Sequence, residues 1–172
     1  MLYIYTDLLY PHIPWSTPLT KTVVILRGIP GSGKTDLAKR LRDGHSYGVE
    51  CVVIVSADDF FMVNGQYIFD GMKVLDAAAD CFVRFVNAFG RPDTDLIIVD
   101  NTNIRFFEVN PYLLLARGRG WKTRVVRLQC NPKVAATRTT HGVPPEVIAQ
   151  MALDMEAIPA LYGITEEVVP TG

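Results

Sequence analysis

GIPGSGKT, at residues 28–35, is the most informative segment of the sequence. It follows the apolar run TVVILR at 22–27 and precedes DLAKRLRD at 36–43, whose periodicity predicts a helix. The pattern G-x-x-x-x-G-K-[ST] between a strand and a helix marks a phosphate-binding loop, in which backbone N–H groups turn inward around phosphate oxygens. The positive end of the following helix adds to the attraction. We expect all eight residues to bind a nucleotide: Gly28, Ile29, Pro30, Gly31, Ser32, Gly33, Lys34 and Thr35.

Two side chains of this loop predict which nucleotide complex it binds. Lys34 is placed to reach the β- and γ-phosphates, and the hydroxyl of Thr35 can bind Mg²⁺. The expected cofactors are therefore ATP and Mg²⁺. Kinases, ATPases, GTPases and nucleotide-dependent switches all share such a loop, so the loop alone does not name a reaction.

Short apolar runs alternate with longer segments of helical period along the chain, which is typical of stacked βαβ units. Strands are expected at 22–27, 51–56, 96–100 and 123–129, and helices at 34–42, 72–89, 108–117, 132–139 and 144–157. The first three strands are nearly continuous apolar runs, as in strands covered on both faces. The pattern predicts an α/β fold, namely a three-layer P-loop NTPase sandwich with a parallel sheet of four to five strands and helices on both faces.

Composition limits the class of protein. The 172 residues, 49% hydrophobic and 20% charged, are typical of one globular domain and exclude wholesale disorder. Seventeen Lys and Arg against eighteen Asp and Glu argue against a highly basic nucleic-acid clamp, but they leave a local basic groove open. The three cysteines have no metal-ligand spacing and suggest reduced thiols. No apolar run approaches the roughly 20 residues of a bilayer span, so we expect a cytoplasmic protein without membrane contact.

Acidic residues follow two of the predicted strands. Asp58 and Asp59 come after the run CVVIV, and Asp100 ends the run LIIVD. Ligands of parallel α/β sheets bind at the carboxyl ends of the strands, so these acids are expected to face the crevice of the phosphate loop. We assign Asp58 as the base that accepts the proton of an attacking hydroxyl, and Asp100 to the Mg²⁺ site. For Asp59, a substrate contact and a capping or solvated role are equal alternatives.

Six segments resemble one family of P-loop kinases. They are RGIPGSGKT, VSADDFF, GQYIFD, IIVDNTN, PYLLLARGRGW and RTTHGVP, and they occur in the family's order over about residues 27–155. The family includes the kinase domains of polynucleotide kinases, and the chain is most similar to the branch related to the ATPase domain of Nedd4-binding protein 2. The resemblance implies that Asp58 is the general base, that Lys34 and Thr35 bind phosphates and Mg²⁺, and that Arg138 is a lid arginine that closes on the donor phosphates.

The chain departs from the end-healing members of that family at one position. Those kinases show an arginine shortly after the Asp pair, which holds the acceptor phosphate, whereas this sequence has Phe60 and Phe61 there. Recognition of the acceptor by that arginine is therefore not expected here.

The charge distribution also points to a lid. From Arg117 to Arg138 there are seven basic residues and no acid, and from Pro144 onward there are five acids and no base. A basic block beside the crevice can stabilise a transferred phosphoryl group or bind a polyanion, although solvated strand and helix ends are the alternative. We expect a lid around residues 131–143 within a single domain at 21–172, preceded by an N-terminal extension at 1–20.

Further residues are candidates for contact with the acceptor: Asp59, Tyr67, Phe69, Asn103 and Arg105. Tyr67 and Phe69 can stack on a base, or they can pin their loop to the domain, and the sequence favours neither. His141, in THGVPPE, is expected to cap or hinge a helix rather than to take part in catalysis.

The sequence therefore predicts an ATP-dependent phosphotransferase with a hydroxyl acceptor, most similar to a polynucleotide 5′-hydroxyl kinase. Its catalytic residues are expected to be Asp58, Lys34 and Arg138, and its acceptor a nucleic acid or a nucleotide. One alternative is a kinase of a hydroxymethylated base in DNA or of a small-molecule hydroxyl. Another is a nucleotide-dependent binding switch without a phosphoryl acceptor. The sequence does not predict an oligomeric state.

Overall fold

A parallel sheet forms the centre of the computed structural model, which describes residues 20–160 and 163–171. The strands are β1 (Thr22–Arg27), β2 (Val52–Val55), β5 (Leu96–Asp100), β6 (Lys122–Cys130) and β7 (Glu166–Thr171). Their order is β2-β5-β1-β6-β7, and every neighbouring pair runs parallel. The expected α/β fold with a parallel sheet of four to five strands is confirmed. The predicted N-terminal extension lies outside the described residues except for Thr20.

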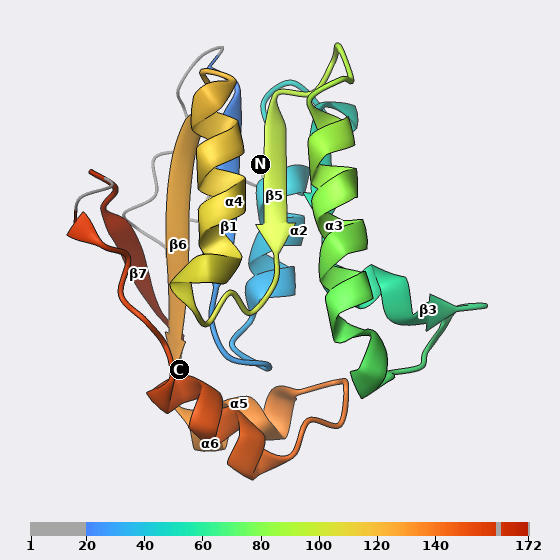
Figure 1. The fold of residues 1–172 in the computed structure, drawn as a ribbon, viewed down its shortest axis with the longest axis vertical. Helices are drawn as coiled ribbons and strands as arrows, with labels where there is room; N and C mark the ends of the chain where they lie inside the picture. Colours follow the sequence, from blue (N-terminus) through green and yellow to red (C-terminus); the bar gives the residue numbers. More distant parts are fainter. Residues whose placement is uncertain (1–19, 161–162, 172) are drawn as a thin grey trace, which may run out of the picture.

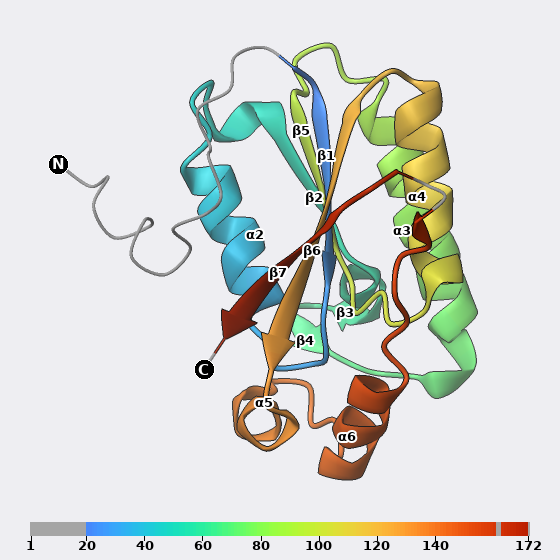
Figure 2. The same ribbon diagram turned by 90° about the vertical axis from the view of Figure 1, so that its left-hand side faces the viewer.

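Helices cover both faces of the sheet, as Figure 2 shows from its edge. One face carries α3 (Val74–Ala88) and α4 (Phe106–Gly118), and the other carries α2 (Lys34–Asp43). Val23 and Ile25 of β1 belong to the core under α3 and α4, whereas Val24 and Leu26 belong to the core under α2. Successive side chains of a strand point to opposite faces, so a strand buried on both faces is apolar throughout.

Two further helices, α5 (Pro132–Arg138) and α6 (Pro145–Leu153), lie beyond the carboxyl ends of the strands (Figure 1). Both have proline in the first turn, where a backbone N–H would have no helical partner. The Asn131 side chain caps α5 by accepting a hydrogen bond from the N–H of Lys133 (2.9 Å). Of the two helices, α5 falls within residues 131–143, where a lid is expected, and its action as a lid stays a prediction.

A small hairpin follows the 3₁₀ helix η2 (Ala57–Phe61) and was not predicted from the apolar periodicity. Its strands are β3 (Met62–Val63) and β4 (Gln66–Tyr67), and they pair antiparallel. The turn residues Asn64 and Gly65 have φ of 49° and 80°, the left-handed conformation of a two-residue Asn-Gly hairpin turn. That dipeptide was the available sequence signal, because strands of two residues leave no periodicity to detect.

Arg27, at the end of β1, is fully buried and connects four parts of the fold. Its guanidinium donates to the backbone carbonyls of Asn103 (2.8 Å), Ile104 (2.9 Å) and Glu156 (2.8 Å), and it forms an ion pair with Glu166 of β7. A buried cation needs this degree of pairing to offset the loss of its hydration. Arg27 therefore fixes the segments after β5 and α6 and the edge strand β7 to the centre of the sheet.

Two arginines of the basic block expected beside the crevice contact the edge strand β7 instead. Arg124 of β6 forms two hydrogen bonds with the carboxylate of Glu167 (2.8 and 2.7 Å), and Arg127 lies 3.4 Å from Glu166. These two arginines pair with the acids of β7, and the role expected for the basic block beside the crevice stays a prediction. No helix in the described ranges has the length and hydropathy of a bilayer span.

Candidate functional site

The phosphate loop connects the end of β1 to the start of α2, at the carboxyl edge of the sheet (Figure 1). Gly31 and Gly33 have φ of 78° and 93°, values that favour glycine. A Cβ atom on Gly31 would lie 2.1 Å from the carbonyl oxygen of Ala135 in α5. The loop thus needs glycine both for its backbone conformation and for its close approach to α5.

The loop carries polar groups in the arrangement that a phosphate ligand requires. Lys34 is 8% exposed, and its Nζ donates to the carbonyl of Ile29 across the loop (3.0 Å). Burial lowers the pKa of its ammonium to about 8, against the opposing charges of Asp100 and Asp58. The hydroxyl of Ser32 is buried and has no hydrogen-bond partner among the described residues. A phosphate oxygen would supply a partner to groups of this kind.

Asp100 and Thr35 fit a Mg²⁺ ion that is shared with nucleotide phosphates. Asp100 ends β5 and is buried, which raises the pKa of its carboxyl, while a hydrogen bond with Thr35 and the charge of Lys34 oppose that shift. No three His, Cys, Asp or Glu side chains form a metal-binding group within the described residues. Mg²⁺ keeps several waters and binds through one or two protein ligands plus phosphates, so a hydroxyl and one carboxylate fit that ion.

A cavity of about 310 Å³ connects the nucleotide residues to the Asp pair. Thr35 and Asp100 line it together with Asp58 and Asp59 of η2. The cavity is also lined by Lys39 and Arg42 of α2, Tyr67 of β4 and His141 of the loop between α5 and α6. The structure therefore brings together the predicted base, the predicted metal residues and one of the predicted aromatic residues.

Asp58 is held by neighbours from three elements. Its N–H donates to the Ser56 hydroxyl (3.3 Å), which caps the turn η2. The hydroxyl of Tyr67 donates to Oδ1 of Asp58 (3.1 Å), and Nε2 of His141 lies 3.8 Å from Oδ2. Burial and the Asp58 charge raise the pKa of Tyr67 to about 12, so Tyr67 remains a donor at neutral pH. The Asp58 side chain is 56% exposed, which leaves room for a further hydrogen bond from a ligand.

Asp59 is paired with a residue that the sequence analysis missed. Arg84 of α3 donates to Oδ2 of Asp59 (2.7 Å), to the carbonyl of Ser56 (2.6 Å) and to Oδ2 of Asp80 (2.8 Å). Asp80 and Arg84 are four residues apart on the helix, a spacing that the sequence does reveal. The contacts with η2 span 25 and 28 residues and leave no local pattern. Arg84 thus clamps the turn that carries Asp58.

Asn101 is a second residue that the sequence analysis missed. Its side-chain oxygen accepts the N–H of Ala57 (2.8 Å), so the end of β5 is hydrogen-bonded to the start of η2. The segment IIVDNTN contains this residue, but its sequence shows only that a turn follows the strand.

Three candidate acceptor residues lie outside the cavity. Asn103 is buried and donates to the carbonyl of Leu26 (2.7 Å). Arg105 pairs with Asp154 (3.3 Å) and Glu156 (3.5 Å) at the start of α4. Phe69 is exposed, and its ring packs on that of Phe61 at 5.1 Å between centroids, which favours the pinning alternative for Phe69. The placement of Asn103 and Arg105 does not support their expected acceptor contacts.

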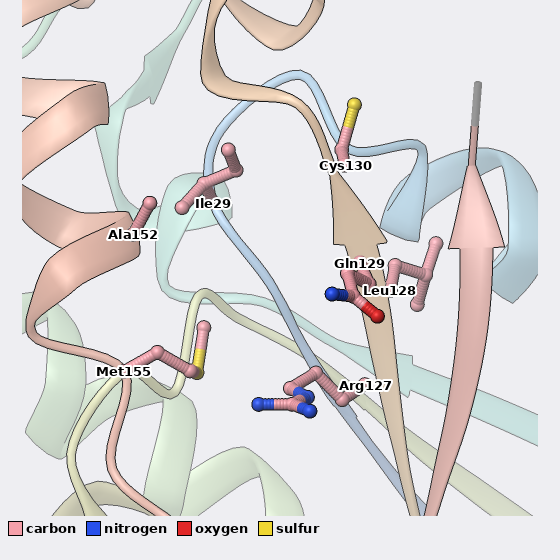
Figure 3. Close-up of a pocket in the computed structure, with 7 residues that line it drawn as sticks. All are labelled: Ile29, Arg127, Leu128, Gln129, Cys130, Ala152 and Met155. Atoms are coloured by element: carbon pink, nitrogen blue, oxygen red, sulfur yellow. The ribbon is translucent and has the colours of Figure 1, made fainter.

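Arg138, the predicted lid arginine, is the last residue of α5 and is exposed. It is not among the residues that line the 310 Å³ cavity, and its catalytic role stays a prediction. A smaller cavity of about 180 Å³ lies between α6 and β6 beside Ile29 (Figure 3). Arg127 lines that smaller cavity, and its Nε lies 3.4 Å from Glu166, the carboxylate that also pairs with Arg27.

Comparison with known proteins places the chain in a family. A family model described as AAA domain matches residues 23–152. Human NEDD4-binding protein 2 is 37% identical over 133 residues, which cover 75% of this chain and 7% of that protein. YLP motif-containing protein 1 of Rattus norvegicus is 27% identical over 172 residues, which cover 89% of this chain and 12% of that protein. The chain therefore spans a small part of the length of these relatives.

Solved structures share the fold at low sequence identity. Kti12 of Chaetomium thermophilum in complex with ADP-AlF3 has a TM-score of 0.61 at 12% identity, covering 86% of this chain and 88% of that one. A chain of the Pnkp1/Rnl/Hen1 RNA repair complex has a TM-score of 0.57 at 16% identity, covering 81% of this chain and 45% of that one. A gluconokinase of Sinorhizobium meliloti 1021 has a TM-score of 0.54 at 14% identity, covering 87% of this chain and 83% of that one.

These comparisons agree with the α/β fold described above. The resemblance to the P-loop kinases related to NEDD4-binding protein 2 is confirmed, and the fold supports a nucleotide-dependent kinase or ATPase. Since the family model covers well over half of the residues, the chain belongs to the AAA domain family.

Proposed function

We propose that this domain transfers the γ-phosphoryl group of ATP to a hydroxyl acceptor, in the manner of a polynucleotide 5′-hydroxyl kinase. The observation that carries the proposal is that one cavity is lined by Thr35 and Asp100 together with Asp58. Phosphoryl transfer depends on holding the nucleotide, the hydroxyl and a proton acceptor in line, and it needs little other chemistry from the protein.

In the proposed reaction, Asp58 accepts the proton of the hydroxyl while the hydroxyl oxygen bonds to the γ-phosphorus. The bond from that phosphorus to the oxygen bridging the β-phosphate breaks, and ADP leaves. Lys34 exchanges the Ile29 carbonyl for phosphate oxygens, and we assign Arg138 of the lid to the transferred group. Thr35 and Asp100 would hold Mg²⁺, which neutralises phosphate charge when it is bound.

The lining of the cavity favours an acceptor that itself carries a phosphate. Thr35, Ala38, Lys39 and Arg42 all line it, and their spacing places them in one stripe along α2. Lys39 lies about 6 Å farther along the helix axis than Thr35, at a rise of about 1.5 Å per residue. Two cations near a general base fit a nucleotide whose hydroxyl reaches Asp58 while its phosphate reaches Lys39 and Arg42. Arg42 donates to Asp43 (2.8 Å) in an exposed ion pair, so its guanidinium keeps further N–H donors for that phosphate.

Transfer of label from γ-labelled ATP tests this function. The acceptors are 5′-hydroxyl RNA, 5′-hydroxyl DNA, hydroxymethylpyrimidine DNA and nucleosides. We expect label in the 5′-hydroxyl oligonucleotides, with a yield that falls as salt is raised, and little label in nucleosides. Label in the hydroxymethylated DNA alone supports a base kinase. Label only in free phosphate, with every acceptor, supports the binding switch and contradicts the proposal.

A pair of variants tests the phosphate contact within the same assay. Lys39→Gln and Arg42→Gln are each expected to raise the KM for an oligonucleotide by about tenfold or more, because a charged hydrogen bond contributes about 1.5–3 kcal/mol. Arg40→Gln removes a charge from the same helix at a position that does not line the cavity, and it is the matched control. An equal rise in KM for all three variants, or for nucleosides as well, contradicts the contact.

A further inference from the structure

His141 makes two contacts with the acceptor side of the cavity. Its ring faces that of Tyr67 at 4.0 Å between centroids with an interplanar angle of 38°, and its Nε2 lies 3.8 Å from Oδ2 of Asp58. Tyr67 in turn donates to the other oxygen of Asp58 (3.1 Å). The three side chains come from η2, β4 and the loop after α5, so no single element accounts for their approach.

His141 lies on the same short segment as the lid helix. It follows Arg138, the last residue of α5, by three positions, and α5 is packed so closely against the phosphate loop that Gly31 cannot carry a side chain. The segment from Ala135 to His141 therefore contacts the phosphate loop at one end and the Tyr67–Asp58 pair at the other.

A capping role, as expected from the sequence, does not explain these contacts. The side chain that caps α5 belongs to Asn131, at the opposite end of that helix, and no side-chain cap hydrogen bond is present at Pro144, the N-cap of α6. Gly142, with φ of 64°, provides the backbone conformation that a hinge needs. A hinge at Gly142 does not require the imidazole of His141 to face Tyr67.

We propose that His141 is a positioning residue for Asp58. Through this contact, His141 closes the lid segment onto the acceptor side of the cavity. This inference rests on the proposed phosphotransferase function and adds a residue to it. By stacking on Tyr67 and approaching Oδ2, His141 holds the carboxylate toward the acceptor hydroxyl and limits the access of water to the same cavity.

Three substitutions separate the two contacts. His141→Phe keeps a ring for Tyr67 and removes Nε2, His141→Gln keeps an N–H donor and removes the ring, and His141→Ala removes both. We expect His141→Ala to lower kcat for transfer about tenfold and to raise the ratio of ATP hydrolysis to transfer. The Kd for ATP should change less than twofold, because the phosphate loop is untouched. The Phe and Gln variants should each recover part of the loss.

The chain offers a matched control in a second His–Tyr pair. The rings of His45 and Tyr47 lie 5.7 Å apart, and neither residue lines the cavity. His45→Ala is expected to leave the ratio of hydrolysis to transfer unchanged. If His45→Ala and His141→Ala change kcat alike, a general effect on folding explains both, and the inference is overturned.

A double-mutant cycle tests whether His141 acts through Tyr67. The variants are His141→Ala, Tyr67→Leu and the two combined, and each is measured both in transfer and in urea unfolding. We expect the effects to be non-additive in both measurements, because each single change already disrupts the same ring pair. Additive effects on kcat overturn the positioning role of His141. A wild-type chain that labels no acceptor overturns both the proposed function and the positioning role. Additive effects on unfolding overturn the contact itself, whatever the outcome of the transfer assay.

Discussion

At the scale of single residues, the site depends on how Asp58 and Lys34 are held before any ligand binds. Lys34 is buried in the loop with its pKa lowered to about 8, and Asp58 is oriented by a tyrosine hydroxyl. Lys34, Thr35, Asp58 and Asp100 could be identified from the sequence because each follows a strand or lies within a short motif. The partners of Asp58 could not be identified in this way, since Tyr67 and His141 reach it only through the fold.

The pKa of Tyr67 gives a prediction at this scale. Its folded-state value of about 12 exceeds the usual value of about 10, so the protonated hydroxyl stabilises the folded state below about pH 10. That contribution is lost as the pH rises from about 10 through 12. We expect an ultraviolet difference titration of wild type against Tyr67→Phe to show one tyrosine with a midpoint near 12.

The same titration checks the cause of the shift. Asp58→Asn removes a charge that raises the pKa of Tyr67, so the midpoint should move toward 10, although burial keeps part of the shift. A midpoint that is the same in the wild type and in the Asp58→Asn variant would show that the two side chains do not interact.

At the scale of secondary-structure elements, the turn η2 is fixed from two directions. Arg84 of α3 reaches Asp59 and the Ser56 carbonyl, while Asn101 after β5 accepts the N–H of Ala57. The helical period of residues 72–89 predicted α3, but it did not indicate that Arg84 of this helix clamps η2. The edge strand β7 was also missed, because EEVVPT has two charges and a proline, which are tolerated at a sheet edge.

Loss of the Arg84 clamp should affect catalysis more than nucleotide binding. Arg84→Ala removes three hydrogen bonds, two of which hold η2, so we expect kcat for transfer to fall about tenfold with little change in the Kd for ATP. Arg84→Lys should recover part of the rate, since one ammonium cannot span all three acceptors. Arg91→Ala, at an exposed position after α3, is the control for the loss of one positive charge. A kcat unchanged by Arg84→Ala would exclude the clamp.

At the scale of the whole molecule, Arg27 joins the centre of the sheet to the segments that close the fold. Its contacts reach across 76 residues to Asn103 and across 139 residues to Glu166. In the sequence, Arg27 is only the last residue of an apolar run, so neither its burial nor its partners could be predicted. The parallel sheet could be predicted because three of its strands, β1, β2 and β5, are nearly continuous apolar runs.

Removal of Arg27 should therefore destabilise the whole domain. Arg27→Met leaves three carbonyls without their donor and leaves Glu166 with the more distant Arg127 alone, and we expect the free energy of unfolding to fall by about 3–5 kcal/mol in urea denaturation. Arg124→Met breaks a partly exposed ion pair with Glu167, the neighbour of Glu166 on β7, and should cost about 1 kcal/mol or less. An equal decrease in the free energy of unfolding for the two variants would show that the buried contacts of Arg27 stabilise the fold no more than a partly exposed ion pair does.

The proposed phosphotransfer site is the cavity that joins the phosphate loop to Asp58, with Asp58 as its base. The most direct measurement compares wild type with Asp58→Asn for transfer of label from γ-labelled ATP to a 5′-hydroxyl oligonucleotide, with ATP affinity measured in parallel. The role of Asp58 as the base predicts that Asp58→Asn lowers transfer by about 10²-fold or more, the usual contribution of a general base, while ATP binds as before. Undiminished transfer by Asp58→Asn would contradict it.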